Sequence, residues 1–268
     1  MTLHPNLSQD SGRYQNSNRD TRSRINFELF VSKNITIILS THNEALSINH
    51  TISELIKHIK DVEIVVVDDN SPDGTPTIIK KLKNKYNWMK YQIRPKKLGL
   101  NTAYKAIYNF AYKHKYKYLI TLDADLSHNA NDIKRFIPLL DKYDFVIGSR
   151  YVKGGKCSMK FSRFILSYFG NLFIKIVLKT KINEHTNSFR GFNLAKLNKK
   201  KIDLKKINSS GYSFFMETIY QLKKNQCSIK EIPITFHDRK FGKSKIPRLE
   251  IFRTLTNLFK LKFFSYFK

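Results

Sequence analysis

The chain has 268 residues, with 49 Lys+Arg against 21 Asp+Glu, a formal net charge of +28 and 41% hydrophobic residues. This length and apolar content suffice for one large or two small folded domains and exclude wholesale disorder. The two cysteines, Cys157 and Cys227, exclude a disulfide framework and a four-cysteine zinc site, so we expect free thiols in a reducing compartment.

The first segment, residues 1–30, is rich in Ser, Asn, Asp and Arg and has no hydrophobic period, which predicts a disordered polar extension. It lacks the apolar core of a cleavable signal. The longest uncharged apolar run, residues 164–174, is too short to span a bilayer. We therefore expect a cytoplasmic protein, either soluble or peripheral on the cytosolic face of a membrane (the endoplasmic reticulum if the source is eukaryotic).

Short apolar, β-branched runs then alternate with segments of helical period. The predicted strands are residues 34–40, 63–67, 91–94, 118–122 and 145–147. The predicted helices are residues 46–59, 75–86, 100–114 and 131–140. This alternation predicts right-handed crossovers and an α/β fold: a Rossmann-like, mostly parallel sheet flanked by helices.

Two later segments combine aromatic and basic residues. Residues 160–178 are rich in Phe and Tyr, which suits either the core or a groove for an acceptor lipid, and we expect the core. Residues 246–268 place Leu and Phe at three- and four-residue steps among Arg and Lys, which predicts a basic amphipathic helix. Such a helix can lie in a membrane interface or pack on the domain, and both interpretations stay open.

Polar side chains directly follow four of the predicted strands. They form the clusters 41–44, 68–70, 123–125 and 148–150. In open α/β sheets the ligand lies beyond the carboxyl ends of the strands. Asp123 and Asp125 have the spacing to approach one divalent cation, and Mg²⁺ commonly combines one or two carboxylates with substrate phosphate oxygens.

Glycine-based phosphate sites do not explain the sequence. No G-x-G-x-x-G follows a strand, and the Walker-like tail Gly242-Lys243-Ser244 has His237 where the upstream glycine is required. Phosphates would therefore be held by a metal ion and basic side chains, since Arg offers a bidentate fork and Lys a point charge.

With these residues in place, the chain resembles family 2 glycosyltransferases, and within them the dolichyl-phosphate (polyprenyl-phosphate) mannosyltransferases. The matching stretches are residues 40–44, 67–75, 94–100, 123–128, 148–151, 188–190, 211–217 and 231–245. They occur in the family's order. Asp-x-Asp is shared by many glycosyltransferases, whereas the element Asp238-Arg239…Gly242…Ser244-Lys245 is more specific to this subgroup.

The resemblance implies a GT-A domain over residues 31–245 and inverting transfer of a hexose, most simply mannose from GDP-mannose to a dolichyl or polyprenyl phosphate, with Mg²⁺ or Mn²⁺. It places the donor at Ser40, His42, Glu44, Val67, Asp69, Asp123, Ala124, Asp125, Arg239 and Lys245. It places the metal at Asp123, Asp125 and Ser127, and the acceptor phosphate at Arg150, Arg163 and Arg190. Asp125, Arg150 and Arg239 would serve catalysis directly.

Some positions depart from the family pattern. Ser40 and His42 stand where Pro and Tyr are usual, Ser127 where many members have Gln, and Glu184 and Asn187 where Asp and Gly are common. These departures leave UDP-glucose open as an alternative donor. The missing general base is no objection, because a phosphate monoester with a second pKa near 6 is largely dianionic at neutral pH.

Two other functions remain as alternatives. A family 2 transferase with a saccharide acceptor would act on soluble sugars without lipid phosphate. A basic nucleic-acid or membrane-surface binding protein is suggested by the charge, but no zinc finger, basic zipper or RNP motif accompanies it, and acidic strand ends repel nucleic acid. The expected partners are a nucleotide sugar, a polyprenyl phosphate, a membrane surface and a small membrane-anchoring subunit, with no specific nucleic acid.

Overall fold

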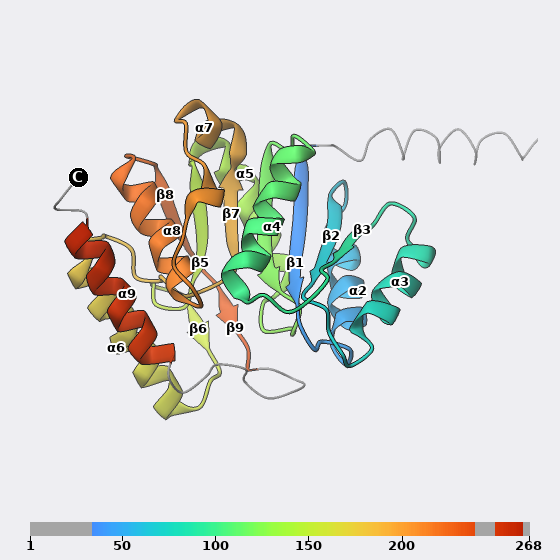
Figure 1. The fold of residues 1–268 in the computed structure, drawn as a ribbon, viewed down its shortest axis with the longest axis horizontal. Coiled ribbons are helices and arrows are strands. Elements are labelled where there is room, and N and C mark those ends of the chain that lie inside the picture. The colour runs from blue at the N-terminus through green and yellow to red at the C-terminus, as the bar shows by residue number, and fades with distance from the viewer. Residues whose placement is uncertain (1–33, 239–249, 265–268) are drawn as a thin grey trace, which may run out of the picture.

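A seven-stranded sheet forms the centre of the computed structural model, which describes residues 34–238 and 250–264 (Figure 1). The strand order is β3-β2-β1-β4-β7-β5-β8, and every strand except β7 runs in the same direction. The bounds are β1 Ile35–Thr41, β2 Glu63–Asp68, β3 Lys90–Ile93, β4 Tyr118–Asp123, β5 Phe145–Ser149, β7 Arg190–Asn193 and β8 Ile229–Pro233. A separate parallel ribbon pairs β6 (Lys156–Cys157) with β9 (Thr235–Phe236).

The five strands predicted from the sequence correspond to β1 to β5, so the mostly parallel sheet is confirmed. The strands β7 and β8 were not predicted from the sequence. β7 lies antiparallel between β4 and β5, and Gly191 at its centre allows it to pass close to α5. A Cβ at Gly191 would stand 2.9 Å from Cδ1 of Phe136. A short strand that contains glycine carries a weak pattern, which explains the omission.

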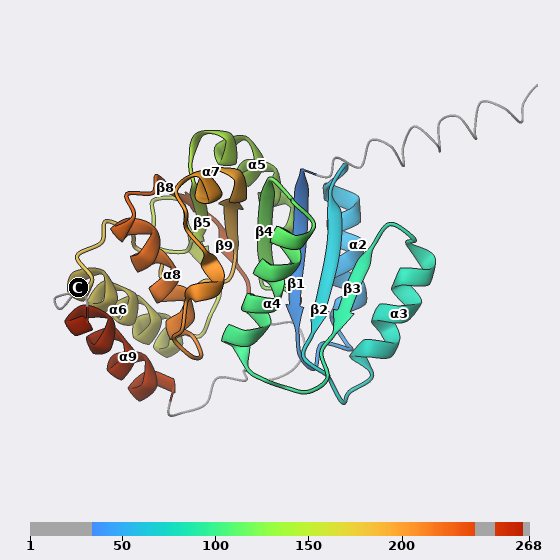
Figure 2. The same cartoon turned by 45° about the horizontal axis from the view of Figure 1, so that its top comes forward.

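Helices cover both faces of the sheet (Figure 2). The bounds are α2 Ile48–His58, α3 Thr75–Lys85, α4 Leu100–Lys113, α5 Ile133–Lys142, α6 Phe161–Val177, α7 Leu194–Lys199, α8 Ser213–Lys224 and α9 Glu250–Phe264, with short 3₁₀ helices at Ala130–Asp132 and Leu204–Lys206. Successive strand residues face opposite sides. Ile37 and Leu39 pack in one core cluster with α2, α3 and α5. Ile38 packs in another with α4, α7 and α8.

The expectation that residues 160–178 belong to the core is wrong. Within α6 only Asn171 and Ile174 are buried. The apolar side chains that α6 leaves exposed are Phe161, Leu166, Tyr168, Phe169, Leu172, Phe173 and Ile176. At 3.6 residues per turn they span an arc of about 160° on one side of the helix. We call this surface the α6 apolar face. The buried residues of the helix lie on its opposite side, and at the edges of the face the Tyr168 ring meets that of Tyr151 and the Phe173 ring meets that of Phe259.

The predicted basic amphipathic helix is present as α9, which lies beside α6 in both views (Figures 1 and 2). Leu258 is fully buried against Ile174 and Met216, whereas Phe252, Phe259 and Phe263 are exposed. The helix therefore packs on the domain and still presents phenylalanines outward. The predicted segments 1–30, 246–249 and 265–268 lie outside the described residues. Among the residues that are described, none of the helices is long and apolar enough to cross a bilayer.

Candidate active site

The carboxyl ends of β2, β1 and β4 lie side by side, which places three of the predicted site residues together. Ser40 of β1 is in register with Val67 of β2 on one side and with Asp123 of β4 on the other. Thr41 is in register with Asp68 one position further. The sheet therefore gathers the polar clusters that follow these strands at one edge, as the sequence analysis predicts.

Asp68 fixes the turn after β2 rather than facing outward. Its side chain is fully buried, and it accepts hydrogen bonds from Oγ1 of Thr41 at 2.9 Å and Oγ of Ser71 at 2.6 Å. The Ser71 backbone N–H donates to its other oxygen at 2.8 Å. Buried carboxylates require such donors, so Asp68 joins the ends of β1 and β2 into a rigid floor.

Asp69 holds the loop that follows β3. Its carboxylate forms an ion pair with Nη1 of Arg94 at 2.7 Å, and both side chains are nearly buried. The backbone N–H groups of Leu98 and Gly99 also point at it, at 3.3 Å. The carboxylate of Asp69 therefore holds the loop 94–99 in place. A contact between Asp69 and a nucleoside stays a prediction. Arg94 belonged to a matching motif, but its role as the partner of Asp69 was missed.

The other predicted donor-binding residues lie at the same edge with different degrees of access. Ser40, His42 and Glu44 are half-buried, and Glu44 accepts a hydrogen bond from Oγ of Ser47 at 2.7 Å. The side chain of Val67 is fully buried in the core beneath α4, so only its backbone can line a nucleoside pocket. Ala124 is likewise buried, and its carbonyl accepts from Oγ1 of Thr51 at 2.8 Å.

A tight turn after β4 orients the acidic pair. Asp123 ends β4 half-buried, and Asp125 is 2% exposed. Oδ1 of Asp125 accepts from the Ser127 N–H at 3.1 Å and from its hydroxyl at 2.6 Å. Leu126 takes a left-handed conformation with a φ of 64°, which few non-glycine residues adopt. Ser127 therefore orients Asp125, and its predicted contact with a metal ion stays a prediction.

His128 braces the same turn. Its Nδ1 accepts from the Asp123 backbone N–H at 3.3 Å, so Nε2 carries the proton and donates to Oδ1 of Asn187 at 2.8 Å. The amide of Asn187 continues to the Gly148 carbonyl at 2.8 Å. This chain of contacts links the end of β4 to the end of β5, and it gives His128 a structural role.

Arg150 follows β5 and is connected to the acidic turn through the rings of Phe236 and His128. Its guanidinium stands 5.0 Å from the Tyr151 ring and 5.2 Å from the Phe236 ring. Phe236 in turn meets the His128 ring edge-on at 5.5 Å, and their backbones form a β-bridge. The structure therefore brings a fixed arginine to the edge of the sheet that carries Asp123.

The other basic residues that were predicted to bind phosphates lie partly within and partly outside the described residues. Arg163 lies on α6 and forms an ion pair with Oδ1 of Asp238 at 3.2 Å, with both side chains partly exposed. Asp238 is two residues beyond Phe236, the last residue of β9, so Arg163 and Arg150 approach the same short segment. Arg239 and Lys245 lie outside the described residues.

Arg190 does not suit the acceptor-phosphate role predicted for it. It is fully buried, and its guanidinium donates to the carbonyls of Asn187, Phe215 and His185 at 2.6, 2.9 and 2.9 Å. The guanidinium also lies 4.5 Å from the Phe215 ring, and burial lowers its pKa to about 10. We therefore correct the assignment: Arg190 is a structural residue that joins β7 to α8.

Sequence comparison decides the family. The profile of Glycosyl transferase family 2 matches residues 36–199. The chain belongs to this family. A polyprenol monophosphomannose synthase of Mycolicibacterium smegmatis is 32% identical over 213 residues, which cover 78% of this chain and 80% of the relative. An undecaprenyl-phosphate mannosyltransferase of Micrococcus luteus is also 32% identical, with 79% of this chain and 87% of the relative covered.

Solved structures show that this glycosyltransferase has the GT-A fold. Glucosyl-3-phosphoglycerate synthase from Mycobacterium tuberculosis, solved with Mn²⁺ and UDP, matches with a TM-score of 0.60 at 14% identity, covering 85% of this chain and 80% of that one. A mannosyltransferase from Pyrobaculum calidifontis, solved with GDP-Man and Mn²⁺, matches with a TM-score of 0.52 at 16% identity, covering 91% and 76%.

The acidic turn of this glycosyltransferase fits a divalent cation shared with a substrate. Asp123 and Asp125 supply carboxylate oxygens, the ligands that Mg²⁺ and Mn²⁺ prefer. No group of three or more His, Cys, Asp and Glu side chains suited to a metal ion occurs within residues 34–238 and 250–264. Where Mg²⁺ binds a diphosphate, it typically combines one or two protein carboxylates with phosphate oxygens and water.

The corrected role of Arg190 gives a stability prediction. Replacing Arg190 by methionine leaves three buried carbonyls without their donor, and each is expected to cost about 1–3 kcal/mol. We expect the free energy of unfolding to fall by about 4 kcal/mol, measured by urea denaturation. Arg163→Met, which removes a partly exposed ion pair, should change it by less than about 1 kcal/mol. Equal losses in the two variants would contradict the structural role.

His185, next to the predicted site, gives a pH prediction. The His185 side chain is fully buried, and its Nε2 lies 2.9 Å from Oγ1 of Thr180. Burial lowers the pKa of His185 from 6.5 to about 4. Between these two values the unfolded chain binds a proton that the folded chain does not, so stability falls as the pH falls, by up to about 1.4 kcal/mol per pH unit. Urea midpoints from neutral pH down to about pH 4 should drop less steeply in His185→Gln than in the wild type.

Proposed function

We propose that this family 2 glycosyltransferase transfers mannose from GDP-mannose to the phosphate of a polyprenyl or dolichyl phosphate, with inversion at the anomeric carbon. The observation that carries the proposal is the approach of Arg150, whose guanidinium is fixed, to the acidic turn at the end of β4 through Phe236 and His128. The names of the two relatives that are 32% identical support the mannosyl and polyprenyl parts, and the GDP-Man complex of the Pyrobaculum enzyme supports the donor.

The reaction needs two anions held in line. A phosphate oxygen of the acceptor attacks C1 of the sugar, the bond from C1 to the diphosphate breaks, and GDP leaves with the electron pair. Attack from the face opposite the leaving group inverts C1. Because the acceptor phosphate is already mostly dianionic at neutral pH, no protein base has to remove a proton. The enzyme contributes alignment and charge compensation.

The residues divide between the two anions. Asp123 and Asp125 would hold a divalent cation, Mg²⁺ or Mn²⁺, which would offset the charge of the departing diphosphate. Ser127 keeps Asp125 in position. Arg150 and Arg163 would bind the acceptor phosphate. In this proposal Arg239 and Lys245 bind donor phosphates.

The test measures transfer of radiolabelled sugar into lipid. GDP-mannose and polyprenyl phosphate are incubated with the enzyme and Mg²⁺ or Mn²⁺, and a matched sample receives EDTA; UDP-glucose runs in parallel. We expect metal-dependent mannolipid whose product anomer is opposite to that of the donor. Product from UDP-glucose alone would keep the mechanism and change the donor. Transfer to soluble sugars but not to lipid phosphate would overturn the proposed acceptor.

The proposed acceptor also places the enzyme at a membrane. Polyprenyl phosphate is anchored in a bilayer, and most of the α6 apolar face is exposed, on the helix that carries Arg163. The neighbouring α9 adds exposed Phe252, Phe259 and Phe263 together with exposed Arg253 and Lys260. Apolar side chains flanked by cations are typical of helices that lie in the interface of anionic membranes. We therefore extend the predicted membrane contact from α9 to α6.

A further inference from the structure

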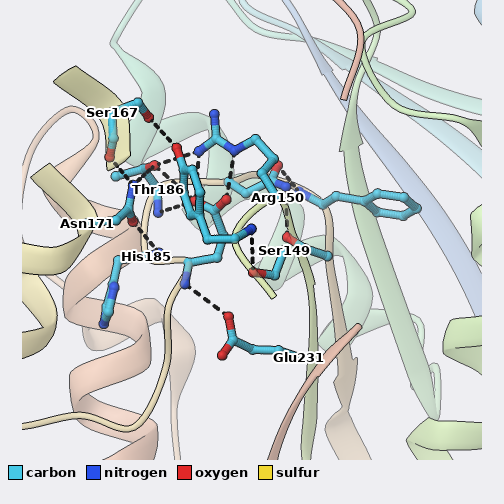
Figure 3. A network of polar contacts seen from close by, with 12 residues as sticks. Ser149, Arg150, Ser167, Asn171, His185, Thr186 and Glu231 are labelled. Carbon is cyan, nitrogen blue, oxygen red and sulfur yellow. Dashed lines mark hydrogen bonds and ion pairs between the residues drawn. The ribbon is translucent and has the colours of Figure 1, made fainter. Parts of the chain in front are cut away.

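Arg150 is held by one buried carboxylate, that of Glu184. Nε donates to Oε2 of Glu184 at 2.7 Å and Nη2 donates to Oε1 at 2.8 Å, a bidentate fork (Figure 3). Nη2 also donates to Oγ1 of Thr186 at 3.1 Å. Glu184 is fully buried, and the Arg150 side chain is 8% exposed. Among the described residues, Nη1 has no hydrogen-bond partner, and Figure 3 shows it pointing away from the network.

From this geometry we propose that Glu184 is a positioning residue, which locks the guanidinium of Arg150 so that Nη1 is presented to the acceptor phosphate. The inference rests on the proposed function and deepens it. Arg190, the other buried arginine of this region, satisfies its donors with backbone carbonyls, whereas Arg150 pairs with a carboxylate. The bidentate pair instead fixes both the position and the plane of the guanidinium.

Glu184 is itself immobilised from two sides. Oε1 accepts from the N–H and the hydroxyl of Thr186 at 3.2 and 3.1 Å. The backbone N–H of Glu184 and that of Asn183 donate to the Glu231 carboxylate at 3.0 and 2.9 Å. On the far side, Thr186 accepts from Nδ2 of Asn171, on α6, at 3.3 Å. The carboxylate therefore cannot follow a moving arginine, and it holds the guanidinium in one orientation.

Because Glu184 and Arg150 carry opposite charges, the main effect of the pair is to orient the Arg150 guanidinium. Burial alone would raise the pKa of Glu184, but the facing guanidinium outweighs it and holds the pKa below the ordinary value. The same pair raises the pKa of Arg150 against the effect of its own burial. Both groups are thus charged at neutral pH and together neutral. Because Glu184 neutralises the charge of Arg150, a phosphate at Nη1 is recognised mainly through the direction of the N–H donor. A lysine in place of Arg150 lacks the planar fork that sets this direction.

The experiment compares Glu184→Gln with a matched control at a second buried carboxylate that pairs with a basic side chain. Gln keeps the size of Glu184 and removes its charge. The control is Asp144→Asn at the opposite end of β5, where a buried carboxylate pairs with Nζ of Lys200 at 2.9 Å, remote from Arg150. We expect Glu184→Gln to raise the KM for polyprenyl phosphate about 100-fold, because a misplaced reacting group costs about this factor. The KM for GDP-mannose should stay within about twofold.

Further variants separate positioning from folding. Arg150→Lys should reproduce the loss, and the double variant with Glu184→Gln should lose little more than either alone, because the two residues act as one unit. Asp144→Asn should reduce thermal stability and leave the KM for the lipid acceptor unchanged. A Glu184→Gln enzyme with an unchanged KM for the acceptor overturns the inference, as does an additive double variant or an equal rise in KM for the Asp144→Asn control.

A binding measurement keeps this inference separate from the proposed function. Titration calorimetry with a short-chain alkyl phosphate reports the phosphate site without sugar transfer. Weaker binding to Glu184→Gln than to wild type supports the positioning role even if no mannolipid forms, and that outcome would contradict the proposed reaction alone. Equal binding to both proteins, or no binding to wild type, overturns the role of Glu184.

Discussion

Replacing Asp125 by asparagine is expected to reduce the rate of mannose transfer by about a thousandfold, the largest effect of any single substitution in this chain. Asparagine has the same shape, and its amide oxygen can still accept from the N–H and hydroxyl of Ser127, so the turn should be retained. The variant loses the negative charge that would draw a divalent cation to the donor diphosphate. Initial rates at increasing Mg²⁺ measure the effect, and the apparent affinity for the cation should fall together with the rate.

The matched control for this prediction is Ser127→Ala, which leaves both carboxylates and removes only the hydroxyl that orients Asp125. We expect a loss of about tenfold, because the Ser127 N–H still donates to Asp125 and the lost hydroxyl bond contributes about 1.5 kcal/mol, the low end for a hydrogen bond to a charged group. An Asp125→Asn enzyme that keeps more than a tenth of the wild-type rate at saturating Mg²⁺ would show that Asp125 does not hold the cation. Unchanged circular dichroism of both variants excludes misfolding as the cause.

The acidic edge of the site was predictable because it follows from sheet geometry. Parallel strands all end at one edge, so polar residues after Thr41, Val67 and Asp123 had to meet there once the strands were assigned. Three of the stretches that carry the family resemblance, residues 40–44, 67–75 and 123–128, lie at these strand ends. The prediction therefore needed only strand assignments and the order of motifs, and no side-chain contact.

Other features depended on contacts that a sequence pattern does not encode. An arginine suggests phosphate binding, but burial decides otherwise for Arg190, whose partners are three carbonyls. The sequence predicts that the carboxylate of Asp69 contacts the donor, but in the structure this carboxylate pairs with Arg94, 25 positions later in the chain. A helical period of apolar residues predicts that one face of the helix is buried, but it does not show which part of the protein packs on that face. For α6 nothing among the described residues covers most of that face.

The uncovered face of α6 leads to the second large expected effect, the loss of membrane binding in the triple variant Phe161→Ser, Phe169→Ser and Ile176→Ser. These side chains are 78%, 57% and 63% exposed, so their removal should not destabilise the fold. Burying such a side chain in an apolar phase is worth about 1.5–3 kcal/mol, and partial insertion of three of them about 4 kcal/mol together. We expect binding to vesicles of mixed neutral and anionic lipid to weaken about 1,000-fold, measured by flotation.

Leu46→Ser is the matched control, because Leu46 is 73% exposed and precedes α2, far from α6 along the sheet. This control should bind vesicles as the wild type does. The triple variant should still mannosylate a short-chain acceptor in solution while failing on acceptor embedded in vesicles, because the α6 apolar face would bring the enzyme to the lipid without touching the sugar. Undiminished vesicle binding by the triple variant would contradict the role of the α6 apolar face and would indicate that other surfaces, among them the phenylalanines of α9, bind the membrane.

Raising the salt should weaken wild-type binding to anionic vesicles, since Arg253 and Lys260 are exposed on α9, the helix beside α6, and their attraction to the headgroups is screened.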